Sequence, residues 1–284
     1  MNPQPDRSIF ETDNLCAWCI VPYDNLNRNA LQRAQMLKEL GIRKFAYDWR
    51  SWHLPYLAEE IRAMRLYNIE ISAVWFWTDG GGPKLLNDNN ETILKTLKEE
   101  GLITNLWVAF PEEFFMDLSD NEKLRKAITA INEIYMRAVE INCSVSLYNH
   151  GGWFGDIENQ LNIIESCGHK DIGIAYNFFR GVHNTDNFRI LLHKMLPYLK
   201  IINLNGIKSE GPGIWTDEEA LGPPYILTIG SGDMEQEMMK IIYESGYTGL
   251  IGLIGHTSGQ DVMEVLEGNI KGLKRVVDSN FTIP

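Results

Sequence analysis

Side chains that can transfer protons or bind polar groups follow most of the β-rich runs in this sequence. They are Asp48 and Arg50, Asp79, Glu112 and Glu113, Tyr148, Asn149 and His150, Asn177, Arg180 and His183, Asn203, Asn205 and Lys208, and His256. Histidine, carboxylates and tyrosine are common general acids and bases, and Arg and Lys stabilise developing negative charge. These residue types suit proton transfer on a polar small molecule.

Two of the runs carry polar residues at every second position. These residues are Ser144, Ser146, Tyr148 and His150 in one run, and Asn203 and Asn205 in another. Alternate residues of a strand share a face. A buried polar group without a partner costs about 1–3 kcal/mol, so each polar face needs water, a ligand or a neighbouring strand. For Asn203 and Asn205 the sequence leaves a ligand and a neighbouring strand as alternatives.

Tryptophans lie in or just after many of the β-rich runs. They are Trp18, Trp49, Trp52, Trp75, Trp77, Trp107 and Trp153. Such rings either pack in the core or present a flat face to a ligand, and the apolar faces of sugars stack on them. Packing accounts for most of the seven. We expect Trp77 and Trp153 to line a ligand pocket.

Histidines and cysteines raise the question of a metal. His150, His183 and His256 could together bind a divalent ion, or they are hydrogen-bonded loop residues; their spacing favours neither interpretation. Cys16 and Cys19 form a single CxxC inside an apolar run. Residues three apart on a strand point to opposite faces, so we expect two buried core cysteines rather than a zinc or redox site.

Eight β-rich runs alternate with segments of helical period. The runs are Leu15–Val21, Lys44–Trp49, Ile69–Trp77, Asn105–Phe110, Cys143–Tyr148, Ile172–Asn177, Lys200–Asn205 and Leu250–Ile254. This order predicts an α/β fold, a single (β/α)8 TIM barrel over residues 1–284 with residues 1–14 as an N-terminal extension. A doubly wound sheet would place a glycine-rich turn after its first strand, and Gly80–Gly82 instead follow the third run as a flexible loop. The site is then expected at the carboxyl ends of the strands.

Composition limits the partners. The chain has 284 residues and a formal net charge of −12, which disfavours a nucleic-acid partner and fits a neutral substrate better than a highly phosphorylated one. A stretch of about 18 apolar residues, as a membrane span requires, does not occur. Residues 1–12 lack the apolar segment of a signal peptide, so we expect a cytoplasmic protein or an exported one whose signal is absent from this chain.

Several segments resemble one family of barrels. Ile229–Met234 (IGSGDM), Ser245–Gly249 (SGYTG) and Leu147–Gly152 (LYNHGG) resemble xylose-isomerase-like TIM barrels. Ala17–Pro22 (AWCIVP) and Phe45–Arg50 (FAYDWR) resemble the sugar phosphate isomerase/epimerase branch of that superfamily. The resemblance covers residues 15–277 and implies a sugar isomerase or epimerase.

The resemblance also implies where a metal would bind. In that family two Glu, one Asp and one His hold a divalent ion, and the glutamates move a proton across an enediolate. Those positions fall on Tyr148, Asn177, Asn203 and Ile254 (or His256), and Arg180 falls where many relatives have another His. Neutral amides and phenols bind divalent ions weakly. The resemblance therefore implies a rearranged site, with Mn, Mg or Zn as the ions to consider and none certain.

The resulting hypothesis is a carbohydrate-active enzyme that abstracts a proton next to a sugar carbonyl. His150 or His256 would be the base, Tyr148 an acid and Glu112 a second base; Arg180 and Lys208 would hold an enediolate, carboxylate or phosphate. The predicted substrate-binding residues are Asp48, Arg50, Trp77, Asn149, Trp153, Asn177, Arg180, His183, Asn203, Asn205 and Lys208. The alternatives are a keto-sugar lyase or hydratase and a non-catalytic sugar-binding barrel or partner subunit. We expect a small carbohydrate ligand, no membrane association, and leave a homo-oligomer open.

Overall fold

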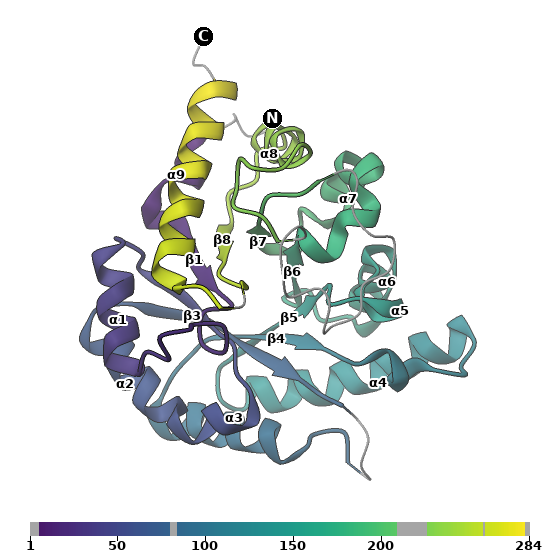
Figure 1. The fold of residues 1–284 in the computed structure, drawn as a ribbon. Helices are drawn as coiled ribbons and strands as arrows, with labels where there is room; N and C mark the ends of the chain where they lie inside the picture. The colour runs from purple at the N-terminus through teal and green to yellow at the C-terminus, as the bar shows by residue number, and fades with distance from the viewer. Residues whose placement is uncertain (1–5, 80–83, 209–225, 258, 282–284) are drawn as a thin grey trace.

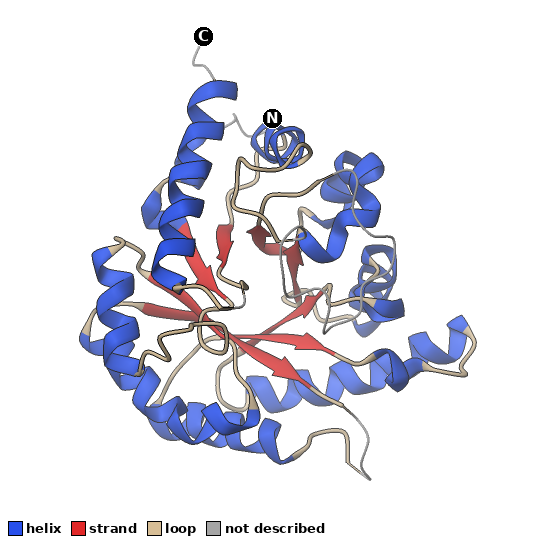
Figure 2. Cartoon of the chain, in the orientation of Figure 1, coloured by secondary structure: helices blue, strands red, loops and turns tan. Residues whose placement is uncertain are grey.

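The fold is a closed barrel of eight parallel strands, paired in sequence order from β1 round to β8 (Figure 1). We describe a computed structural model over residues 6–79, 84–208, 226–257 and 259–281, without the side chains of residues 182–185. Helices surround the strands (Figure 2). The predicted (β/α)8 barrel is confirmed, and Gly80–Gly82 lie outside the described residues.

All eight strands coincide with the predicted β-rich runs. They are β1 (Leu15–Trp18), β2 (Lys44–Tyr47), β3 (Glu70–Trp77), β4 (Asn105–Ala109), β5 (Ser144–Tyr148), β6 (Gly173–Asn177), β7 (Leu199–Leu204) and β8 (Leu250–Ile254). β1 is three residues shorter than its run, because Cys19 adopts a left-handed conformation with φ 57°. A non-glycine residue rarely takes that conformation, and it turns the chain out of the barrel wall.

Helices fill the connections. The α-helices are α1 (Ala30–Glu39), α2 (Leu57–Leu66), α3 (Asp88–Glu100), α4 (Asp120–Val139), α5 (Gly152–Gly155), α6 (Ile157–Cys167), α7 (Phe188–Met195), α8 (Glu235–Glu244) and α9 (Val262–Asn280). The 3-10 helices are η1 (Arg7–Phe10), η2 (Thr12–Asn14), η3 (Ser51–Tyr56), η4 (Glu112–Phe115) and η5 (Phe179–Asn187). Capping boxes at Asn29 and Asn87 begin α1 and α3, since each side chain satisfies an orphan N–H.

The strands are buried on both faces, as parallel strands covered by helices must be. Along β3, Val74 and Phe76 belong to the large apolar core, whereas Ala73 belongs to a second cluster with Trp18, Trp107 and Tyr148. This second cluster fills the barrel interior. It pairs bulky rings with the small residues Ala46, Ala73, Ala109 and Ala175, which leave the volume that the rings occupy.

The N-terminal extension packs against the last helix. The ring of Phe10 stacks on that of Phe281 with centroids 5.7 Å apart, and Arg7 pairs with Asp278 at 2.9 Å. Both contacts join η1 to the end of α9, next to the seam between β1 and β8. Within the described residues, no helix has both the length and the apolar character that a bilayer span needs.

Candidate active site

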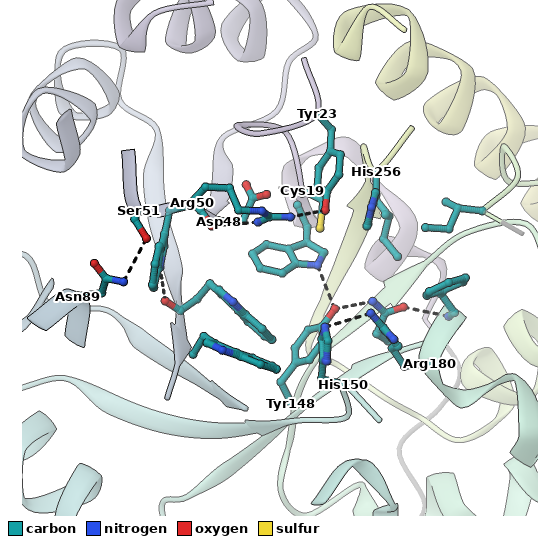
Figure 3. A pocket seen from close by; sticks show the side chains of 18 of the residues that line it. Cys19, Tyr23, Asp48, Arg50, Ser51, Asn89, Tyr148, His150, Arg180 and His256 are labelled. Atoms are coloured by element: carbon teal, nitrogen blue, oxygen red, sulfur yellow. Dashed lines mark hydrogen bonds between the residues drawn. The ribbon is translucent and has the colours of Figure 1, made fainter. Parts of the chain in front are cut away.

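A cavity of about 500 Å³ lies at the carboxyl ends of the strands, within the usual range of about 300–1,000 Å³ for small-molecule sites. It is lined by Trp18, Cys19, Tyr23, Asp48, Trp49, Arg50, Ser51, Trp75, Trp77, Asp79, Asn87, Asn89, Tyr148, His150, Asn177, Phe179, Arg180, Ile226, Ile254 and His256. Figure 3 shows two polar groups in it: Tyr148, His150 and Arg180 on one side, and Tyr23, Asp48 and Arg50 on the other.

Three aromatic rings line one side of the cavity, Trp18, Trp75 and Tyr148, and Trp107 packs against two of them without lining it. We call these four rings the aromatic floor. The Trp18 and Trp107 centroids lie 4.8 Å apart and those of Trp75 and Tyr148 4.9 Å apart, both in edge-to-face geometry. Trp77 extends the floor toward His150, with centroids 5.1 Å apart. Interlocked rings of this kind are rigid and present apolar faces, which suits the C–H face of a sugar.

The Tyr148 hydroxyl is held by two donors. Trp18 Nε1 donates to its oxygen at 3.1 Å, and the Asn177 side-chain amide donates to the same oxygen. A phenolic oxygen that accepts two hydrogen bonds retains its own O–H to donate. Burial raises the pKa of Tyr148, so this O–H stays protonated at neutral pH.

Asn149 and Asn177 fix the ends of β5 and β6. Asn149 donates to the Asn177 carbonyl at 3.1 Å and accepts from the Asn177 backbone N–H at 2.7 Å. The Asn177 side-chain oxygen accepts from the Phe179 N–H at 2.9 Å. Both side chains therefore use their amide groups in hydrogen bonds within the protein. Asn177 lines the cavity, whereas Asn149 does not. Their main effect is to orient Tyr148 and the start of η5.

His150 and Arg180 meet at the mouth of the β5–β6 side. Arg180 Nη2 lies 3.0 Å from His150 Nε2. A guanidinium can only donate, so Nε2 is the acceptor and the ring proton belongs on Nδ1. His150 also packs between Trp75 and Trp77. This contact restricts the imidazole to one orientation over the aromatic floor.

On the opposite side, Arg50 is oriented by its neighbours on β1 and β2. Its Nη2 donates to the Tyr23 hydroxyl at 2.5 Å and its Nη1 to the Trp49 carbonyl at 2.9 Å. The Tyr23 ring in turn stacks on His256, with centroids 3.7 Å apart. One chain of contacts therefore links the ends of β1, β2 and β8.

Asp48 is a buried carboxyl in the cavity wall, only 3% exposed. Its Oδ1 accepts from the Val21 N–H at 3.2 Å, and its Oδ2 has no hydrogen-bond partner among the described residues. Burial raises the pKa of Asp48 to about 6, because the charged form is poorly solvated there; Arg50 and Arg33 act in the opposite direction.

Cys16 and Cys19 are both buried core residues with free thiols, as predicted. Cys19 also lines the cavity, at the point where the left-handed backbone with φ 57° ends the strand pattern. Burial raises the pKa of the Cys19 thiol well above its usual range, so it stays a neutral thiol.

Part of the lining is polar and includes Ser51, Asn87 and Asn89, which the sequence did not predict as site residues. Asn89 donates to the Ser51 hydroxyl at 3.3 Å, and Asn87 donates to Asp79, a predicted candidate, at 3.2 Å. Ser51 begins η3, and Asn87 and Asn89 lie at the start of α3. Asn and Ser at helix starts are ordinary capping residues, so only the fold reveals that they face a cavity.

Other predicted site residues lie elsewhere. Glu112 is exposed in η4, with its side chain over Gly152, and Trp153 packs on Phe115 at 5.1 Å. Lys208 is exposed, and the side chain of His183 is outside the described part of the chain. Glu112, Trp153 and Lys208 are not among the described residues that line the cavity.

Asn203 and Asn205 are buried beneath the mouth rather than in the lining. Asn203 is fully buried against Gly252 of β8, and neither of its side-chain polar atoms has a partner among the described residues. Asn205 donates to the Gly206 carbonyl at 2.9 Å. Asn203 shares its face of β7 with Ile201 of the interior cluster, whereas Ile202 and Leu204 belong to the outer core. Neither Asn203 nor Asn205 is among the residues that line the cavity, and ligand contact by either one stays a prediction.

The donor set does not fit the metal that the fold family implies. At the positions of its ligands the chain has a phenol that accepts two hydrogen bonds and an amide whose oxygen and nitrogen are both used. The third position is Asn203, whose side-chain oxygen and nitrogen have no partner among the described residues, and the fourth is Ile254, which cannot ligate, or His256. Among the described residues no group of three or more His, Cys, Asp or Glu is placed to hold an ion. Proteins hold divalent ions mainly with carboxylate, imidazole or thiolate ligands.

Neither protein-family models nor curated proteins match the sequence, but solved structures match almost the whole chain. The probable 3-DHS dehydratase AsbF from Bacillus anthracis is 14% identical with a TM-score of 0.68, covering 94% of this chain and 99% of its own. The IolI protein, solved with a zinc atom, is 13% identical with a TM-score of 0.70, covering 95% and 100%.

The 3-keto-D-glucoside 4-epimerase YcjR from E. coli is also similar, at 14% identity and a TM-score of 0.67, covering 94% of this chain and 99% of its own. At this level of identity the matches establish the fold. The chain has the fold of the xylose isomerase-like TIM barrels, which confirms the resemblance seen in the sequence.

Proposed function

We propose that the protein is a carbohydrate-active enzyme of isomerase or epimerase type that moves a proton on a carbon next to a sugar carbonyl. The observation that carries this proposal is the Tyr148 hydroxyl, which two N–H donors hold at the cavity surface with its own O–H left to donate. A preorganised donor of this kind stabilises the oxyanion that forms when the carbon next to a carbonyl loses its proton.

The proton acceptor in this proposal is His150. Its Nε2 takes the proton from carbon, the C–H electron pair becomes the C=C bond of an enediolate, and the carbonyl oxygen gains the negative charge. Arg180, at 3.0 Å from Nε2, transfers its hydrogen bond to that oxygen as the imidazole becomes cationic. Tyr148 donates to the same oxygen.

Return of the proton determines the product. Delivery to the opposite face of the same carbon gives an epimer, and delivery to the neighbouring carbon gives an isomer. His256 is the candidate for this second step, since it lines the cavity from β8, stacked on Tyr23. Glu112 takes no part, because its exposed side chain lies over Gly152 outside the lining.

Similar folds carry related chemistry, which supports the proposal. One of the solved structures is a 3-keto-D-glucoside 4-epimerase and another a probable 3-DHS dehydratase. Epimerisation and dehydration both begin by proton loss next to a carbonyl. A keto-sugar lyase or hydratase is therefore a variant of the same mechanism, with a leaving group departing from the enediolate.

Proton NMR in heavy water with a panel of aldoses, ketoses and 3-keto-sugars tests the proposal. We expect deuterium at a carbon next to the carbonyl of at least one sugar, and an unsaturated product if the enzyme is a lyase. His150→Gln should reduce exchange by about 10²-fold or more, whereas His193→Gln, in an exposed residue of α7, should leave it unchanged.

A non-catalytic sugar-binding barrel is the second candidate. The observation that favours it is the absence of any carboxylate at the four positions where the family resemblance places the metal ligands. The same NMR panel separates the two: sugar binding with no exchange at any carbon would support the binding protein and rule out the enzyme.

A further inference from the structure

Buried arginines in this protein are generally paired with carboxylates. Arg33 lies 3.0 Å from Glu60. Arg28 contacts Asp24 at 2.7 Å and Asp261 at 2.8 Å. Such pairing offsets the cost of removing a charge from water, which is several kcal/mol for an unpaired ion. The partly buried arginines of the cavity can therefore be compared with these carboxylate-paired arginines.

Arg50 differs from these arginines in its hydrogen-bond partners. It is partly buried, and its guanidinium donates only to uncharged oxygens, those of Tyr23 and Trp49. Among the described residues no carboxylate oxygen lies within ion-pair distance of it. Asp48, two residues earlier on the same strand face, instead directs Oδ1 to the Val21 N–H. A cation is thus held at the cavity surface with N–H groups still available.

We propose that Arg50 binds an anionic group of the carbohydrate, a carboxylate or a phosphate; this inference rests on the proposed function. A guanidinium binds either group through two parallel hydrogen bonds. Tyr23 and Trp49 hold the fork in place, so little side-chain entropy is lost on binding. Arg180 lines the same cavity from β6 and adds a second positive charge.

Local charge here outweighs the charge of the whole chain. The net charge of −12 favoured a neutral substrate, but a field summed over the surface is screened beyond about 8–10 Å at physiological salt. The carboxylates in the lining are Asp48 and Asp79. Asp48 is turned toward Val21, and Asp79 is an exposed residue that accepts from Asn87. Neither one forms an ion pair with Arg50 among the described residues, although the charge of Arg50 acts against the burial that raises the pKa of Asp48.

Isothermal calorimetry at pH 7 tests the inference with four probes: glucose, glucuronate, the neutral methyl ester of glucuronate, and glucose 6-phosphate. We expect at least one anion to bind about 10- to 100-fold more tightly than the neutral sugars, the range for a charged hydrogen bond. Preference for glucuronate over its ester identifies a carboxylate, and preference for glucose 6-phosphate identifies a phosphate.

Variants assign the preference to Arg50. Arg50→Gln should abolish it, Arg50→Lys should keep part of it, and Arg62→Gln, a surface residue paired with Glu100, should leave it unchanged. Melting temperatures check that each variant folds; if Arg50→Gln does not, Arg50→Lys and Tyr23→Phe still report a weakened preference. Binding of both anions no tighter than that of the neutral sugars, or an undiminished preference in folded Arg50→Gln, would overturn the inference.

Failure of the Arg50 inference and failure of the proposed function give different results. Deuterium exchange into neutral sugars alone would overturn the role of Arg50 and leave the enzyme proposal intact. Tight, Arg50-dependent binding of an anionic sugar that never exchanges would support Arg50 and contradict the enzyme proposal.

Discussion

At the scale of single residues, Asp48 is held where one of its oxygens has no donor. The Val21 N–H satisfies Oδ1, whereas Oδ2 is buried without a partner among the described residues. Burial raises the pKa from 3.8 to about 6. The folded protein therefore keeps a proton between about pH 4 and pH 6 that the unfolded chain releases. The contribution of Asp48 to stability therefore falls as pH rises through that window and levels off above it.

Asp48→Asn should remove this dependence. Each unit of pKa shift corresponds to about 1.4 kcal/mol, so the free energy of unfolding of the natural protein should fall, relative to the variant, by roughly 3 kcal/mol between pH 4 and pH 7. Urea unfolding of both proteins at pH 4, 5, 6 and 7 measures this difference. Parallel stability curves would show that Asp48 does not titrate in this range.

Residue type and strand position predicted much of the lining. Asp48, Arg50, Tyr148, His150 and Arg180 all follow strand ends and all line the cavity. Cys19 is buried as predicted, but strand alternation gave no sign that it would also line the cavity, because one left-handed φ angle interrupts the strand there. Tyr23, Ser51 and Asn89 could not be predicted, because loop geometry and not periodicity brings them to the mouth.

At the scale of elements, α1 and α2 are joined by a buried ion pair. Arg33 and Glu60 are 5% and 3% exposed, and Arg33 Nη1 also donates to the Arg28 carbonyl at 2.7 Å. Burial raises the pKa of Glu60 even though Arg33 opposes that shift. The two helices flank β2, the strand that carries Asp48 and Arg50 into the cavity.

Removing one partner of this ion pair should lower the free energy of unfolding more than replacing both partners by apolar residues. Arg33→Met leaves a buried carboxylate unpaired and should lower the free energy of unfolding by about 3–5 kcal/mol, whereas Arg33→Met with Glu60→Leu should recover most of that loss. Urea unfolding of the two single variants and the double variant forms the cycle. Additive losses in the double variant would contradict a coupled pair.

Element positions were the most predictable feature of the chain. Eight apolar runs separated by helical periods admit few folds, and β8 matches its predicted run at both ends. The depth of a side chain below the cavity was less predictable. Asn203 and Asn205 alternate with apolar residues as a ligand-binding face would, and Asn203 is fully buried beside Gly252 of β8 without lining the cavity.

At the scale of the whole molecule, the barrel brings side chains from six strand ends around one cavity. The IolI structure, whose fold is similar, was solved with a zinc atom. This chain has a phenol and two amides where the resemblance places metal ligands, and the phenol and one amide bond to each other. In the mechanism that we propose, Tyr148, His150 and Arg180 supply the proton acceptor and the oxyanion donors instead of a metal and two glutamates.

The most direct test of this account is the rate at which solvent deuterium enters the substrate before and after dialysis against a chelator, for the natural protein and for Tyr148→Phe. We predict exchange that is unchanged by chelation and about 10²- to 10³-fold slower in Tyr148→Phe, the cost of losing one oxyanion donor. Exchange that disappears on chelation and returns with manganese, or that survives intact in Tyr148→Phe, would contradict it.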